Sequence, residues 1–144
     1  MRPLREVFEV GEPRLFSVAH TSSVLDVARA MNEAGASAAI VMEGGLVRGI
    51  VTEHDMLERV VCPGIPAADT PVTRVMTAPV IGVDLDAPFA AVAELMSRRS
   101  IRHILVRDHE KPIAVVTARD LLVAELAERR RYIDDLEHYL YRYR

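Results

Sequence analysis

The sequence has few of the features that mark secreted, membrane-spanning or metal-binding proteins. It contains one cysteine, Cys62, so no disulfide can form within the chain, which is typical of proteins from a reducing compartment. No apolar run approaches the roughly 18 to 20 residues that a transmembrane helix needs. The segment after Arg2 lacks the apolar core of a secretory signal. We therefore expect a cytoplasmic protein that makes no contact with a membrane.

Motifs for catalysis and metal binding are also missing. The five histidines show no metal-ligand spacing with one another or with Cys62, so we expect no metal site. The pair Gly44-Gly45 fits a hairpin turn better than a phosphate-binding loop. No serine or cysteine lies in a context that would activate it as a nucleophile. We therefore expect that the chain is not an enzyme.

The composition is that of an ordinary globular protein. Half of the 144 residues are apolar and 27% are charged, which is too apolar for a disordered chain. The net charge of -3 gives no general attraction to nucleic acid or to anionic membranes. The length allows one domain or two small, tightly packed ones.

The two halves of the sequence align without a gap when one is shifted by 65 positions. The matched pairs include Val18 and Val83, Val27 and Val92, Ala28 and Ala93, Met31 and Met96, Val41 and Val106, Val51 and Val116, Thr52 and Thr117, Asp55 and Asp120, and Leu57 and Leu122. An internal repeat is stronger evidence than the assignment of any single segment. Two copies of this length indicate a pseudo-symmetric pair rather than a solenoid.

Each half reads as a helix, a β-hairpin and a second helix. The first half predicts a helix capped within 21–23 and ended by Gly35, strands over 38–42 and 46–51, and a helix from Thr52 to before Pro63. The second half predicts a strand over 80–83, a helix from Asp86 and Pro88 to Arg99, strands over 104–107 and 113–116, and a helix from Thr117 to about Tyr141. The fold class is therefore α/β, or α+β.

A unit of this size buries too little surface to be stable alone. We expect the sheets of the two units to pack face to face, with a cleft on each side of the shared interface. The expected organisation is an N-terminal extension over 1–14, a first unit over 15–62, a linker over 63–71, a second unit over 72–128, and a helical tail over 129–144.

The most informative motif is the run from Gly49 to Asp55, where a strand ends and a helix begins. The hydroxyl of Thr52 can bond to a phosphate or sugar oxygen, and the carboxylate of Asp55 can accept hydrogen bonds from a ribose diol. Gly49 would let a ligand approach the backbone closely. Thr117 and Asp120 occupy the same places in the second copy. Both pairs also fit a helix capping box, in which they only satisfy backbone N–H groups.

These motifs, in this order and occurring twice, resemble those of CBS domains. The family's ribose-phosphate signature is a glycine, an apolar residue, a variable residue, a threonine or serine, and an aspartate three residues later. The run from Gly49 to Asp55 matches it in full, whereas Ala114 replaces the glycine in the second copy. The resemblance covers roughly residues 15–125. It implies a stand-alone pair of CBS units, called a Bateman module, with a regulatory role.

By this resemblance, the clefts bind an adenosine-containing ligand such as AMP, ADP, ATP, S-adenosylmethionine or a nicotinamide dinucleotide. An adenine nucleotide is the expected regulatory ligand, and no cofactor is required. Thr52 and Asp55 would hold the phosphate side and the ribose of one ligand, and Thr117 and Asp120 those of another. Because the chain carries no effector domain, we expect its output to pass through an unidentified partner protein or through its oligomeric state.

Further candidate residues lie beside these motifs. Arg102 and His103 resemble the basic pair with which the family's strand begins, a position that often faces phosphates, and the first half has no charge there. The neighbouring pair Arg98-Arg99 fits a solvated helix end better. Val80 and Ile81 could line an apolar slot for adenine, as could Val83, Phe16 and Val18, although such residues more often belong to a core.

The last helix carries a second pattern. Its apolar residues fall near heptad spacing at Leu122, Leu126, Ile133, Leu136, Leu140 and Tyr143, with Arg129 at one core position. Exposed on a monomer, this stripe would form an unusually large apolar patch, so we expect a homodimer. The basic and aromatic runs 129–132 and 139–144 could instead bind nucleic acid, but acidic residues between them make this the weaker interpretation. A purely structural interaction module is the other alternative.

Overall fold

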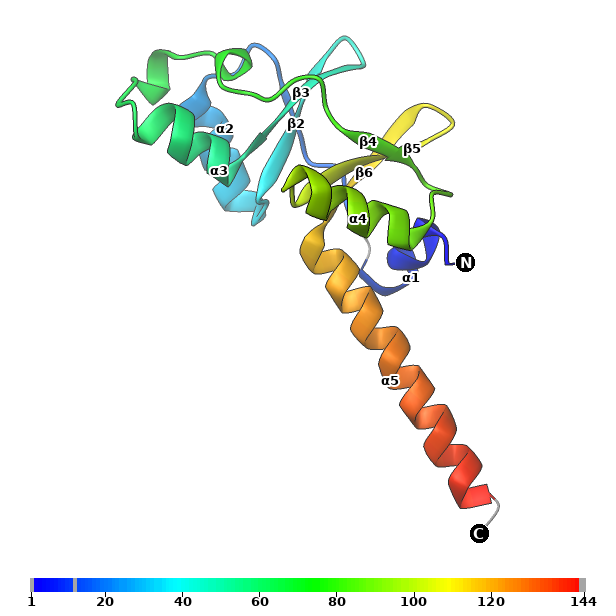
Figure 1. The fold of residues 1–144 in the computed structure, drawn as a ribbon. Helices are drawn as coiled ribbons and strands as arrows, with labels where there is room; N and C mark the ends of the chain where they lie inside the picture. Colours follow the sequence, from blue (N-terminus) through cyan, green and yellow to red (C-terminus); the bar gives the residue numbers. More distant parts are fainter. Residues whose placement is uncertain (1, 12, 143–144) are drawn as a thin grey trace.

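The computed structural model describes residues 2–11 and 13–142, which form two small α/β units and one long helix (Figure 1). Each unit has a three-stranded sheet. The strands are β1 (Ser17–Ala19), β2 (Ala38–Glu43) and β3 (Leu46–Thr52) in the first sheet, and β4 (Gly82–Asp84), β5 (His103–Asp108) and β6 (Lys111–Thr117) in the second. In both sheets the first strand runs parallel to the second, and the second and third form an antiparallel hairpin.

The repeat extends to the register of the strands. Val18 pairs with Val41 in the first sheet, and Val83 pairs with Val106 in the second, at the same offset. The hairpins share even their irregularity, which follows Val41 in one unit and Val106 in the other. The two sequence halves therefore encode the same backbone. The strand predicted over 80–83 is displaced by one or two residues, a usual disagreement at strand ends.

The helix before each hairpin also appears twice. Helix α2 (Val24–Ala34) is capped by the hydroxyl of Ser23, which accepts from Asp26 N, and ends at Gly35 with a left-handed φ of 64°. Helix α4 (Phe89–Arg99) follows Pro88 and ends at Ser100, which takes a similar φ of 52°. Glycine adopts this conformation without steric cost, whereas serine does not.

The helices that follow the hairpins differ between the units. Helix α3 (Glu53–Met56) passes into a wider π-type turn over Leu57–Val61, so the predicted helix is present but irregular. Helix α5 (Ala118–Arg142) is continuous over 25 residues; its first turns pack in the second unit's core, and the rest projects away from both units (Figure 1). No helix within residues 2–11 and 13–142 is long and apolar enough to cross a membrane. Tyr143 and Arg144, which the sequence assigned to the tail, lie outside the described residues.

The two sheets pack face to face, as the sequence predicted. The shared core contains Ile40 and Ile50 from the first sheet and Leu105 from the second, with Val115 packed against it. Residues on the opposite face of β2, such as Val41, pack instead against α2. Strand residues thus alternate between the shared core and each unit's own helices.

The N-terminal segment completes the core of the second unit, which the sequence analysis missed. Leu4 lies in a 3-10 turn (Leu4–Glu6) and Val7 begins α1 (Val7–Gly11), and both are fully buried in the second unit's core. Arg2 lies over the Phe89 ring at 4.3 Å and bonds to Glu125 of α5 at 3.0 Å. The apolar spacing of Leu4, Val7 and Phe8 was the available signal.

The segment between the units is short but structured. It contains 3-10 turns over Ala67–Asp69 and Val72–Arg74. Thr70 is buried, and its hydroxyl donates to the carbonyl of Pro66 at 2.8 Å. Val72 and Val75 belong to the first unit's core. These contacts hold the segment against the first unit.

Candidate functional site

Two cavities lie where the units meet. Cavity 1 has a volume of about 340 Å³ and is lined by Arg14, Leu15, Phe16, Ala38, Thr117 and Asp120 among others. Cavity 2 has a volume of about 720 Å³ and is lined by Thr52, Asp55, Thr77, Arg102, Ala118 and Arg119 among others. Volumes of about 300 to 1,000 Å³ are usual for small-molecule sites.

Each cavity combines the Thr-x-x-Asp motif of one unit with the helix-to-strand turn of the other. Cavity 2 joins Thr52 and Asp55 to the turn at 100–103, whereas cavity 1 joins Thr117 and Asp120 to the turn at 34–38. The two therefore follow the pseudo-two-fold relation of the units. A ligand in either cavity would touch both units.

Both motifs form capping boxes. Thr52 N donates to Asp55 Oδ2 at 3.0 Å, and Asp55 N donates to Thr52 Oγ1 at 3.2 Å. The same two bonds measure 2.8 and 3.1 Å between Thr117 and Asp120. Each threonine hydroxyl keeps its proton for a further bond, and each carboxylate keeps one oxygen outside the box.

The surroundings of the two carboxylates differ. Asp55 is 6% exposed, its Oδ1 accepts from Thr77 Oγ1 at 3.4 Å, and Nη1 of Arg59 lies 3.9 Å from the same oxygen. Asp120 is only half-buried and lines cavity 1. Within the part of the chain that the structure describes, its Oδ1 has no hydrogen-bond partner. Ala124 takes the place of Arg59 in the second copy.

The space beside Gly49 is filled by the chain itself. A Cβ added there would lie 2.6 Å from Sδ of Met76 and 2.9 Å from the carbonyl oxygen of Thr77. Thr77 is bonded through its backbone to Ile50, with N···O distances of 2.7 and 2.9 Å. Gly49 does not line either cavity. The glycine therefore allows the segment before β4 to lie against β3.

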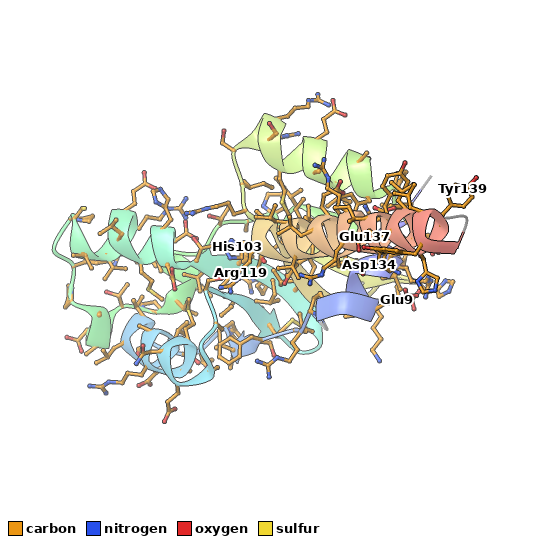
Figure 2. All side chains as sticks on the ribbon, turned by 90° about the horizontal axis from the view of Figure 1, so that it is seen from below. Glu9, His103, Arg119, Asp134, Glu137 and Tyr139 are labelled. Carbon is orange, nitrogen blue, oxygen red and sulfur yellow. The ribbon has the colours of Figure 1, made fainter. Side chains whose placement is uncertain are left out.

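His103 lies between the cavities and lines both of them. Its Nε2 lies 2.8 Å from the hydroxyl of Ser37, so this hydrogen bond joins the two units. Burial lowers the pKa of His103, and the charge of Arg102 lowers it further. Figure 2 shows His103 and Arg119 near the start of α5, where the second unit meets the first.

The other sequence-predicted residues divide between the sites. Arg102 lines cavity 2, whereas Val80 and Ile81 line neither cavity, and Val80 packs against the shared core. Phe16, named as a possible adenine contact, lines cavity 1. Sequence reasoning missed Arg14 and Thr77, which precede the first strands of their units, because no motif marks these positions.

Sequence comparisons agree on one family. The sequence model of the CBS domain matches residues 7–62 and residues 72–127. A CBS domain-containing protein of Arabidopsis thaliana is 31% identical over 115 residues, which are 80% of this chain and 21% of that protein. An uncharacterised protein of Methanopyrus kandleri is 32% identical over 121 residues, which are 83% of this chain and 62% of that protein. The chain thus spans less than two thirds of the length of either relative.

Solved structures show the same fold. A signal-transduction protein with CBS domains from Burkholderia ambifaria superimposes with a TM-score of 0.83 at 28% identity, covering 88% of this chain and 95% of that one. A CBS domain protein from Pyrobaculum aerophilum, complexed with AMP, superimposes with a TM-score of 0.71 at 23% identity, covering 83% and 89%. The chain belongs to the CBS-domain family and carries two copies of the domain in tandem.

Proposed function

We propose that the chain is a regulatory module that binds an adenosine-containing nucleotide between its two CBS units. A partner protein would respond to whether the nucleotide is bound. The observation that carries this proposal is the presence of cavities built from both units, each with a threonine and an aspartate at its wall. A ligand there would bridge the units and change how they sit together. Such a change is a signal that a partner can detect.

The chemistry of the walls supports a nucleotide. Aspartate accepts hydrogen bonds from a ribose diol, and the threonine hydroxyls can donate to phosphate oxygens. Arg14 in cavity 1 and Arg102 and Arg119 in cavity 2 supply positive charge for phosphates. The AMP complex of the Pyrobaculum aerophilum protein shows that this fold accommodates such a ligand in a relative. No residue is proposed for catalysis.

A second candidate function is a structural interaction module without a nucleotide. Its supporting observation is that both threonine–aspartate pairs satisfy each other in capping boxes without any ligand. A capping interaction stabilises a helix by about 1 kcal/mol, which is reason enough for such residues to be present.

A thermal-shift screen separates the two functions. The ligands are AMP, ADP, ATP, S-adenosylmethionine, NAD and NADH, with guanosine monophosphate as a matched control for the base. A ligand present at 100 times its dissociation constant should stabilise the fold by about 2.7 kcal/mol, which a melting curve resolves. If none of the adenosine compounds shifts the melting temperature at millimolar concentration, the structural function is favoured and the sensing function is rejected.

For assembly we propose a homodimer. Leu57 and Val61 on the first unit are 54% and 68% exposed, and their repeat equivalents Leu122 and Leu126 are 59% and 57% exposed. Each unit thus exposes two apolar side chains at equivalent positions of the helical segment that follows its hairpin. A second copy offers a surface of the same chemistry and symmetry. The exposed residues Ile133, Leu136 and Leu140 extend the apolar surface along α5.

A further inference from the structure

The two copies of the signature differ in how accessible their aspartates are, and the sequence motifs do not show this difference. The first copy is complete in sequence, but its aspartate is buried and already bonded. In the second copy alanine replaces the glycine, but the aspartate that lines cavity 1 is only half-buried and has one oxygen without a bond among the described residues. We infer that a ribose-bearing ligand binds in cavity 1 alone, through Asp120, and that Asp55, which lines cavity 2, instead holds the segment over 75–77 that precedes β4. This inference rests on the proposed function.

The segment over 75–77, which precedes β4, is held at several points around Asp55. Arg59 donates through Nη1 to the carbonyls of Val75 and Met76, at 2.9 Å in both cases. Thr77 bonds to Ile50 through its backbone and to Asp55 through its hydroxyl. The bond from Thr77 already uses one lone pair of Asp55 Oδ1, and the carboxylate is 6% exposed. Asp55 is therefore less accessible to a ribose hydroxyl than the half-buried Asp120.

Among the residues that the structure describes, the second copy lacks these contacts. The position equivalent to Arg59 is Ala124, which is fully buried and has no side chain that could reach a neighbouring carbonyl. Val115, equivalent to Ile50, donates through its backbone N to Arg14 O at 3.1 Å, the bond that the described residues show between it and the segment before β1. The carboxylate of Asp120 is left facing the cavity.

One further difference between the walls is the phenyl ring of Phe16, which lines cavity 1 and not cavity 2. Cavity 1 has the aromatic ring of Phe16 beside Leu15 and Val115, which form an apolar surface on which a base can stack. The apolar residues that line cavity 2 are Ile50, Ile101 and Ala118. Ser37, His103 and Thr117 line both cavities, so the two cavities adjoin at these residues.

The matched variants Asp120→Asn and Asp55→Asn test the inference by titration calorimetry with AMP and 2′-deoxy-AMP. Asparagine keeps an acceptor for the capping bond but removes the charge that strengthens a bond to a ribose hydroxyl. Wild-type protein should bind one AMP per chain and prefer it to the deoxy compound. Asp120→Asn should bind AMP about tenfold or more weakly and lose the preference. Asp55→Asn should keep both the affinity and the preference but melt at a lower temperature.

Thr77→Val provides a second test if Asp55→Asn does not fold. It removes the hydroxyl that bonds to Asp55 while keeping a similar shape, so AMP affinity should stay within about twofold and the melting temperature should fall. Two AMP molecules per chain of the wild-type protein, or a loss of affinity in Asp55→Asn equal to that in Asp120→Asn, would overturn the inference while leaving the proposed function standing. Absence of binding by all six adenosine compounds of the thermal-shift screen to the wild-type protein would overturn the proposed function, and the inference with it.

Discussion

Replacing Gly49 with alanine tests whether the space beside this residue is occupied by the segment over 75–77 or by a ligand. The new Cβ would lie 2.6 Å from Sδ of Met76 and 2.9 Å from the carbonyl oxygen of Thr77. The methionine side chain is flexible and can move aside. The Thr77 carbonyl is backbone, and its oxygen accepts from Ile50 N at 2.9 Å, so it cannot move without breaking that bond.

The size of the effect follows from two opposing contributions. Overpacking a well-packed site costs about 1–3 kcal/mol. The backbone at Gly49 lies outside the left-handed region, so alanine can adopt it. Because alanine also reduces the conformational entropy of the unfolded chain, it stabilises the folded protein by about 0.4–1 kcal/mol. We expect the free energy of unfolding to fall by about 1–2 kcal/mol. At about 2–4 °C per kcal/mol, this lowers the melting temperature by roughly 2–8 °C.

Urea unfolding followed by circular dichroism measures this loss, and AMP titration of the same protein measures binding. Ala114→Gly is the matched control, because Ala114 is fully buried at the equivalent position of the second copy. It should also destabilise, by about 1 kcal/mol, through a lost methyl group and a more flexible strand. A Gly49→Ala protein with wild-type stability and weakened AMP binding would refute the reasoning and assign the space to a ligand.

Four further changes have expected outcomes. Ser100→Gly should raise the free energy of unfolding by about 0.5–1 kcal/mol in urea denaturation, because glycine accepts the left-handed φ of 52° without strain. The pKa of histidine in the unfolded chain is about 6.5, and the pKa of His103 in the folded protein is lower, so the free energy of unfolding should fall as the pH drops below about 6.5. His103→Gln should therefore make the melting temperature less dependent on pH between about pH 7.5 and pH 5.5. Arg102→Ala should lower the affinity for ATP, measured by calorimetry, more than the affinity for adenosine, and added salt should reduce this difference. Equal losses of affinity for the two ligands would mean that Arg102 acts through packing. Truncation after Glu128 should weaken the dimer in light scattering while AMP affinity stays unchanged, and a full-length monomer at micromolar concentration would reject the dimer.

The plan of each unit was predictable because it depends on local patterns. Glycine at position 35, the serines before Val24 and the continuous apolar run over 38–42 each determine a nearby cap, turn or strand. The repeat then confirmed each assignment with a second copy. The face-to-face packing followed because neither sheet has enough core of its own.

The asymmetry between the cavities could not be predicted from the motifs. Whether an aspartate is open depends on residues distant in sequence, such as Thr77 for Asp55, and on whether an arginine or an alanine lies four residues later. Val80 and Ile81 were named for an adenine slot from their apolar character, but that character serves packing equally well. A motif identifies the residues of a site, while tertiary contacts decide which of them remain available.

The second unit encloses a segment that is synthesised long before the rest of that unit. Leu4 and Val7 share a core with Leu121 and Ala124, and Arg2 bonds to Glu125 across a separation of 123 residues. A ribosome that adds about 5 to 20 residues per second makes the N-terminal segment roughly 6 to 25 seconds before its packing partners exist. Contacts across so long a loop also form late in the folding search. The two units are thus not independent folding units, and the fold closes only after α5 has emerged from the ribosome.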